Sequence, residues 1–169
     1  MTNEDYRQET ELTEKKFPEG LYIPAKVYHD LADGFSDYKD FAKEVDKLKK
    51  AIVYKGLEPD MNLKVKLSQQ QAEFLHAAMG LITETAEILD ALGSDLEIKD
   101  RVNFAEELGD LHWYIQIFLR HLQITQEEIQ QMNIKKLRTR FPDAFTSYDA
   151  LHRDIAAERK EMEAFCEGI

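Results

Sequence analysis

The amino-acid sequence predicts an all-α protein folded as a compact bundle of four to five helices. Apolar residues recur at spacings of three and four through most of the chain, and few stretches show the period of two that is typical of a strand. Only 7 Gly and 4 Pro interrupt the 169 residues. The length is close to that of one domain, and 43% hydrophobic residues with 10% aromatic residues are sufficient for one core.

The first 35 residues are expected to form an N-terminal arm and an irregular segment, and residues 36–169 are expected to form the helical domain. Residues 1–17 are mostly polar and have little to bury, which favours a loose arm. The next segment contains Pro18, Gly20, Pro24 and Gly34, which favour irregular structure with one short helix after Pro24.

The first clear helix is predicted over residues 37–54 and ends near Gly56, before a predicted loop over residues 57–62. Its apolar residues follow a 4-3-4 spacing and form one stripe: Phe41, Val45, Leu48 and Ile52.

The second helix is predicted over residues 68–92, between a Ser68–Gln71 capping box and Gly93. It is apolar over most of its circumference, which predicts a central position in the bundle. The remaining face combines small residues with two glutamates, so a neighbouring helix can approach those glutamates closely. The residues of this face are Ala77, Gly80, Glu84, Glu87 and Ala91.

Three further helices are predicted towards the C-terminus. One runs from about Asn103, with Glu106 three residues on, to about residue 123. The next opens at a Thr125–Glu128 capping box and is ended by Pro142. The last spans about residues 148–165, and its predicted buried side comprises Leu151, Ile155, Met162 and Phe165.

The charge composition excludes several classes of function. The chain has 22 Lys and Arg against 33 Asp and Glu, a net charge of −11, which argues against binding to a nucleic-acid duplex. It contains no apolar run long enough to cross a membrane, and its start does not resemble a signal peptide. Cys166 is the single cysteine, so an internal disulfide and a zinc–cysteine site are both excluded. We therefore expect a cytoplasmic protein that does not bind membranes.

Two pairs of carboxylates interrupt otherwise apolar helices. Glu84 and Glu87 lie one turn apart on one face, and Glu107 and Asp110 repeat the spacing on the next helix. If the two helices pack antiparallel, four carboxylates converge and repel one another strongly at an effective dielectric constant of ~20. Such a group must take up protons or bind a cation, and oxygen ligands select Mg²⁺ or Mn²⁺ over zinc. The alternative is that both pairs belong to solvated faces. The spacing alone also leaves the neighbouring Glu106 and Asp90 open as ligands.

A di-iron centre is a second alternative for these helices. Such bundles use two Glu-x-x-His pairs, and this chain has one, Glu73 with His76.

A later helix carries Asn133, Lys136 and Arg140 on one face, which indicates a ligand with phosphate groups. The alternative is a solubilising face whose cations lie near a helix C-terminus, where the helix dipole favours them. Tyr114 follows Asp110 by one turn, so it is either a ligand-contacting residue or a core tyrosine.

Together these residues resemble the MazG-like, all-α nucleoside triphosphate pyrophosphatases. The family pattern of E-x-x-E followed by E-x-x-D is similar to ETAE at residues 84–87 and ELGD at residues 107–110. The family's basic helix resembles NIKKLRTRFPDAF, which starts at Asn133, and HAAMG and LHRDIAAER also look like short bacterial and phage-type members. The resemblance covers roughly residues 70–160.

The resemblance implies a helical bundle that assembles as a homodimer or homotetramer, with sites built partly across subunits. It implies hydrolysis of a nucleoside triphosphate, such as a dNTP, between the α and β phosphates, with Glu84 or Glu87 as a candidate base. The implied ligands of Mg²⁺, or of Mn²⁺, are Glu84, Glu87, Glu107 and Asp110. The implied substrate-binding residues are Asn133, Lys136, Arg140 and Tyr114. Two other functions stay open: a phosphoribosyl-ATP pyrophosphatase, and a non-catalytic helical protein that binds nucleotide or metal.

Overall fold

The computed structural model describes residues 2–17, 21, 23–55, 66–93 and 95–167, and it confirms the all-α prediction. The described residues form seven α-helices and one π-helical segment and contain no strand. No helix among them is both long enough and apolar enough to cross a membrane. The predicted loop at residues 57–62 lies outside the described residues.

The chain divides into two compact units, which are described separately. One unit comprises Tyr22–Leu122, and the other comprises Met1–Leu21 with Gln123–Ile169. The predicted domain boundary between residues 35 and 36 stays a prediction.

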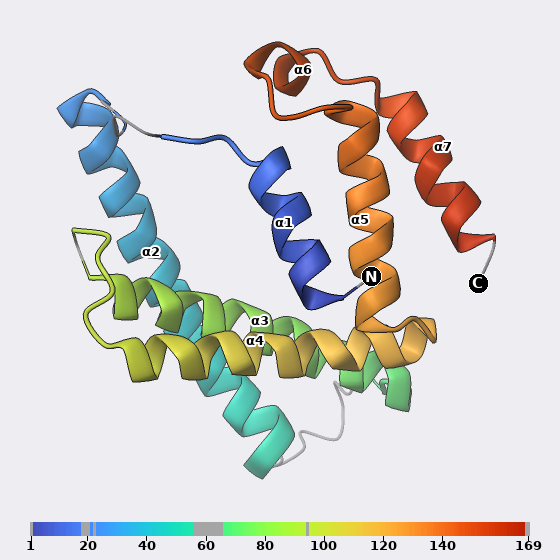
Figure 1. The fold of residues 1–169 in the computed structure, drawn as a ribbon. Coiled ribbons are helices and arrows are strands. Elements are labelled where there is room, and N and C mark those ends of the chain that lie inside the picture. The colour runs from blue at the N-terminus through green and yellow to red at the C-terminus, as the bar shows by residue number, and fades with distance from the viewer. Residues whose placement is uncertain (1, 18–20, 22, 56–65, 94, 168–169) are drawn as a thin grey trace. The chain divides into compact units, whose positions relative to one another are not determined.

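The unit Tyr22–Leu122 is built on two long helices, α3 (Gln69–Leu92) and α4 (Arg101–Leu122), which lie side by side and antiparallel (Figure 1). Their contact is close because α3 presents Gly80 to the ring of Tyr114. A Cβ atom at Gly80 would lie 2.2 Å from Cε1 of that ring. Tyr114, Ala77 and Ile117 form the buried core of the pair. The small residues of α3 therefore allow α4 to approach, as the sequence predicts.

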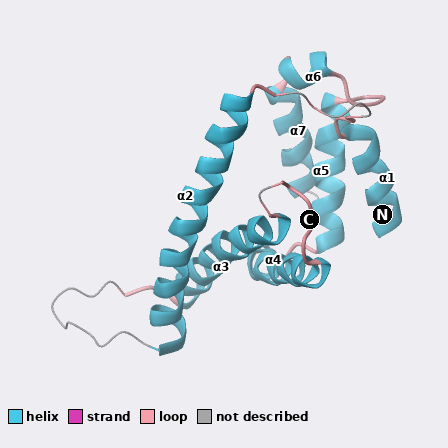
Figure 2. Cartoon of the chain, turned by 90° about the vertical axis from the view of Figure 1, so that its left-hand side faces the viewer, coloured by secondary structure: helices cyan, strands magenta, loops and turns pink. Residues whose placement is uncertain are grey.

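Helix α2 (Ala25–Lys49) packs against α3, and the π-helical segment η1 (Lys50–Lys55) continues it (Figure 2). The Tyr38 hydroxyl donates a hydrogen bond of 2.9 Å to the Ile82 carbonyl of α3. The prediction of irregular structure up to residue 35 is wrong after Pro24. Pro24 occupies the N-cap position, and Gly34 lies inside the helix at a cost of about 1 kcal/mol relative to Ala, which does not end it.

The predicted apolar stripe is confirmed at Val45 and is wrong for its other three residues, including Ile52, which is exposed. The buried residues of α2 are Ala42, Val45 and Lys49, whereas Phe41 and Leu48 are exposed. The face that packs on α3 is therefore one that combines a small residue with a lysine.

The start of α3 is confirmed: Ser68 and Gln71 form the capping box, and Gly93 follows the last turn at a φ of 67°. The start of α4 differs from the prediction. Asp100, rather than Asn103, caps it, because its Oδ1 accepts hydrogen bonds from the backbone N–H groups of Val102 and Asn103.

The other unit contains α1 (Asn3–Thr13), α5 (Gln126–Arg140), α6 (Ser147–Leu151) and α7 (Ile155–Cys166), and α5 packs against both α1 and α7. The loose arm predicted over residues 1–17 is wrong, because Thr2 and Asp5 form a capping box that opens α1. The predicted capping box of α5 at Thr125 and Glu128 is confirmed.

The single last helix predicted over residues 148–165 is two helices, since Thr146 and Asp154 each cap a new start. Leu151 and Ile155 flank this break and are exposed, whereas Glu158 is the buried residue of α7.

Candidate metal centre

The antiparallel pair α3 and α4 brings three of the four predicted metal ligands together. Glu84 of α3 and Glu107 and Asp110 of α4 each offer one carboxylate oxygen, and these oxygens all lie within 4.8 Å of one another. Glu84 and Glu107 retain only 6% and 4% of their exposure, whereas Asp110 is exposed. The group is therefore closed on its protein side and open to a ligand at Asp110.

The negative charges of these carboxylates are not fully compensated by positively charged neighbours, and the pKa of Glu107 reflects this. The pKa of Glu107 is raised to about 7 by burial first, then by repulsion from Glu87 and by hydrogen bonds with Glu84 and Glu87. The raised pKa means that Glu107 holds its proton to a higher pH than an ordinary glutamate does. A cation placed among these oxygens would remove the repulsion and release that proton.

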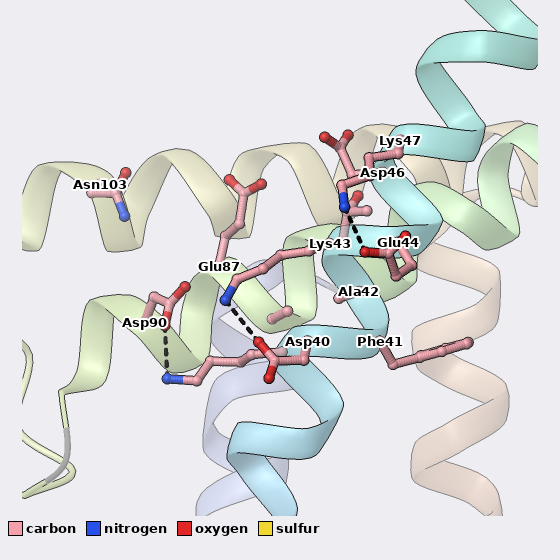
Figure 3. Close-up of a pocket in the computed structure, with 13 residues that line it drawn as sticks. Asp40, Phe41, Ala42, Lys43, Glu44, Asp46, Lys47, Glu87, Asp90 and Asn103 are labelled. Atoms are coloured by element: carbon pink, nitrogen blue, oxygen red, sulfur yellow. Dashed lines mark hydrogen bonds and ion pairs between the residues drawn. The ribbon is translucent and has the colours of Figure 1, made fainter.

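Glu87, the fourth predicted ligand, lies outside the three-residue group but interacts with Glu107. Its pKa is raised by partial burial and by repulsion from Glu84. It lines a cavity of about 970 Å³ that is bounded mainly by α2 and α3, with Asn103 contributed by α4 (Figure 3). Figure 3 shows that Lys43 and Lys47 of α2, at the rim of this cavity, pair with acidic residues of their own helix.

The donor set fits a hard divalent cation. All the available ligand atoms are carboxylate oxygens, the set that Mg²⁺ and Mn²⁺ prefer, and no His or Cys belongs to the group in the part of the chain that the structure describes. The residues left open by the sequence do not join this group. Asp90 pairs with Lys39 at 2.8 Å, and Glu106 is exposed.

The Glu73–His76 pair of the di-iron alternative does not join it either. Glu73 instead pairs with Arg120 at 3.2 Å and with His121 at 2.5 Å on α4. A hydrogen bond from Gln69, followed by those from His121 and Arg120, lowers the pKa of Glu73 to about 2. Glu73 therefore serves as a link between α3 and α4.

Lys49 is the residue of this region that the sequence analysis missed. Its ammonium group lies 2.8 Å from Thr83 Oγ1 and 3.4 Å from Glu84 Oε1, and the Lys49 side chain is buried. Burial alone would lower the pKa of Lys49, but interactions with Tyr114 and Glu84 outweigh it and raise that pKa. The spacing of Lys49 from Ala42 and Val45, at seven and four residues, was the signal that could have placed it on the buried face.

The predicted phosphate-binding face lies on α5, in the unit described separately from the carboxylates. Arg140 makes two hydrogen bonds to Glu158, of 2.8 and 2.7 Å, and Asn133 donates to the Tyr6 hydroxyl at 3.4 Å. Lys136 is half-buried. Arg140 thus has a structural partner within its own unit, which the sequence did not indicate.

Tyr114 belongs to the core of its unit. It retains 7% exposure, and its ring contacts those of His76 and Trp113, with centroids 5.5 and 4.9 Å away. The more exposed ring at this position is that of Trp113. A direct contact of Tyr114 with a ligand stays a prediction.

Comparison with known families tests the resemblance. Residues 72–145 match the family model of the MazG nucleotide pyrophosphohydrolase domain. This segment is similar to a MazG domain. The match includes both carboxylate pairs and the basic helix, and it supports nucleotide pyrophosphohydrolase as the general kind of enzyme. Searches of curated proteins and of solved structures each found no match.

The MazG match gives the carboxylate group a chemical context. Enzymes of this type use divalent metal ions, and the group of Glu84, Glu107 and Asp110 is compatible with such an ion.

Proposed function

We propose that this protein is a Mg²⁺-dependent nucleoside triphosphate pyrophosphohydrolase. It converts a nucleoside triphosphate, specifically a dNTP, into nucleoside monophosphate and pyrophosphate by hydrolysis between the α and β phosphates. The observation that carries the proposal is the convergence of Glu84, Glu107 and Asp110 inside the segment that matches the MazG domain.

Glu84, Glu107 and Asp110 would hold the metal ion, with Glu87 as a fourth carboxylate beside them. Mg²⁺, or Mn²⁺ in its place, supplies neutralisation of the polyphosphate charge and Lewis acidity at the scissile bond. The buried Glu84 and Glu107 fix the protein side of the site, and the exposed Asp110 leaves the other side open to the substrate.

Glu87 is the best placed general base. It lines the large cavity, and its raised pKa makes it a better proton acceptor than an ordinary glutamate. The oxygen of a water molecule forms a new bond to phosphorus, the bridging P–O bond breaks, and pyrophosphate leaves. The proton that the water loses passes to the Glu87 carboxylate.

Asn133, Lys136 and Arg140 are proposed to hold phosphate oxygens, with Tyr114 near the nucleotide, as the resemblance implies. For Arg140 this role requires that it share its guanidinium between a phosphate and Glu158, to which it already bonds. Its planar group has five N–H donors, so a second acceptor is chemically possible. The resemblance also supports the proposed homodimer or homotetramer. The proposed cytoplasmic location rests on the composition, including the single cysteine.

The test is product analysis on a panel of NTPs, dNTPs and phosphoribosyl-ATP, with Mg²⁺ and with EDTA. The proposal expects equimolar pyrophosphate and monophosphate from a dNTP, and only when Mg²⁺ is present. If phosphoribosyl-ATP were the single compound hydrolysed, the proposed substrate would be wrong and the protein would be a phosphoribosyl-ATP pyrophosphatase. Release of orthophosphate as the first product would contradict the proposal, because a different bond would then be cut.

A further inference from the structure

Lys49 occupies an unusual position for a lysine. It is the last residue of α2, directly before the π-helical segment η1, and it retains only 6% exposure. A lysine is rarely buried without compensating partners, because its ammonium group loses its hydration. The next residue, Lys50, is exposed and pairs with Asp46 on the surface.

The partners of Lys49 belong to the carboxylate site or border it. Its Nζ lies 2.8 Å from Thr83 Oγ1, 3.4 Å from Glu84 Oε1 and 3.6 Å from Asp46 Oδ1. Thr83 Oγ1 also lies 2.8 Å from the same Oε1 atom. The ring of Tyr114 covers the ammonium group, with its centroid 5.5 Å away. Two donors, Lys49 and Thr83, thus converge on one oxygen of Glu84, and the Tyr114 ring covers the ammonium group of Lys49.

The positive charge of Lys49 therefore lies beside the oxygens that a divalent ion would use. Glu84 supplies both the Lys49 contact and one ligand atom of the three-residue group. Two cations that share a buried carboxylate repel each other, and the burial of Glu84 and Lys49 weakens screening by solvent. The ammonium group must therefore oppose the binding of a metal ion while it compensates the carboxylates in the metal-free protein.

We propose that Lys49 acts as a resident counter-ion of Glu84 and thereby lowers the affinity of the site for a metal ion. The proposal rests on the metal site of the proposed function but does not require turnover. It assigns a role to a residue outside the MazG match, which begins at residue 72.

The test is titration of the full chain with Mn²⁺ alone, followed by electron paramagnetic resonance, at pH 7.5. Lys49→Met keeps the length of the side chain and removes its charge, and it is expected to lower the Kd for Mn²⁺ by at least about tenfold. Lys49→Arg keeps the charge and is expected to bind Mn²⁺ with nearly the wild-type affinity. The matched control is Lys50→Met, which removes the neighbouring exposed lysine and is expected to change the Kd less than about twofold.

A merely structural role would give the opposite direction, because a disturbed Glu84 can only bind metal less well. Unchanged or weaker binding in Lys49→Met would overturn the proposal, as would equal tightening in Lys49→Arg. If Lys49→Met does not fold, Lys49→Gln provides a second neutral variant that can still donate to Thr83, and the same tightening is expected. Tightening in a protein that hydrolyses no nucleotide would leave this inference intact while the proposed function failed.

Discussion

Two buried glutamates of this protein have opposite electrostatic environments. Glu107 of α4 lies among other carboxylates, and its pKa is raised to about 7. Glu158 of α7 lies between Arg140 and Arg153, with N–O distances of 2.7 and 2.8 Å, and its pKa is lowered to about 2. Both side chains are almost fully buried.

This difference distinguishes a structural ion pair, at Glu158, from a candidate metal site, at Glu107. Glu158 has two arginines and four hydrogen bonds, so its charge is compensated within its own unit. Glu107 has carboxylate neighbours, and no ion pair to it occurs among the described residues, so a proton or a metal ion would compensate its charge. Burial of a charge alone does not identify a functional residue, whereas burial without compensation makes Glu107 a candidate metal ligand.

The largest expected effect is on catalysis by Glu107→Gln. The variant should lose more than about 100-fold of the proposed pyrophosphohydrolase activity, since even outer-shell partners of a metal site contribute 10–100-fold. Because the neutral amide removes a repelling charge, the metal-free variant should unfold at the wild-type temperature or above it. Steady-state kinetics and thermal unfolding in EDTA measure the two effects. Full activity in this variant would remove Glu107 from the site.

Substitution of Glu158, the glutamate that pairs with two arginines, should lower stability and leave metal binding unchanged. Glu158→Gln is expected to lower the free energy of unfolding by about 2 to 3 kcal/mol, because it leaves two arginines without their charged acceptor. The matched control is Glu163→Gln on the same helix, which breaks the exposed pair with Arg159 and should cost less than about 1 kcal/mol. Urea unfolding measures the stability of both variants. Equal losses of unfolding free energy would contradict the claim that the buried pair matters more than the exposed one.

Gly80→Ala tests how close α3 and α4 must lie to keep the carboxylates together. The new Cβ would lie 2.2 Å from the Tyr114 ring, so we expect a loss of about 1 to 3 kcal/mol and weaker Mn²⁺ binding. Gly109→Ala is the control, since nothing lies within 4 Å of a Cβ there. This control should gain about 0.5 to 1 kcal/mol from helix propensity. Equal changes in unfolding free energy for the two variants would show that the close contact between Gly80 and Tyr114 does not limit stability.

The pH dependence of stability should have opposite signs for the two glutamates. The folded pKa of Glu158 is lowered, so its contribution is present above pH 4.5 and is lost as the pH falls towards 2. The folded pKa of Glu107 is raised, so the metal-free protein should lose stability as the pH rises from 4.5 through 7. Comparison of wild type with Glu107→Gln in EDTA isolates this loss. An identical pH profile for the two proteins would argue against the raised pKa.

The sequence predicted the parts of the fold that depend on local chemistry. The Ser68–Gln71 and Thr125–Glu128 capping boxes and Gly93 place the ends of α3 and α5 correctly, because a cap is a short-range hydrogen-bonding pattern. The position of Glu84, Glu107 and Asp110 in one group followed from helical spacing and a short connection. The capping boxes required no knowledge of tertiary packing, whereas the carboxylate group followed only once antiparallel packing of the two helices was assumed.

The features that the sequence did not predict depend on long-range partners. The buried face of α2 combines Ala42 with Lys49 because it packs on α3 and on Glu84, and the apolar residues Phe41 and Leu48 gave a misleading stripe. The pairing of Arg140 with Glu158 spans 18 residues and two helices, so no local pattern reveals it. The helix over residues 3–13 was missed because its strength lies in Thr2 and Asp5 and not in apolar periodicity.

The most direct test of the metal site is a Mn²⁺ titration of wild type, Glu107→Gln and Glu158→Gln, followed by electron paramagnetic resonance. The account predicts that wild type and Glu158→Gln bind Mn²⁺ with similar affinity and that Glu107→Gln loses at least about tenfold. Equal affinity in all three proteins would contradict it, because the carboxylates between α3 and α4 would then not be the metal ligands.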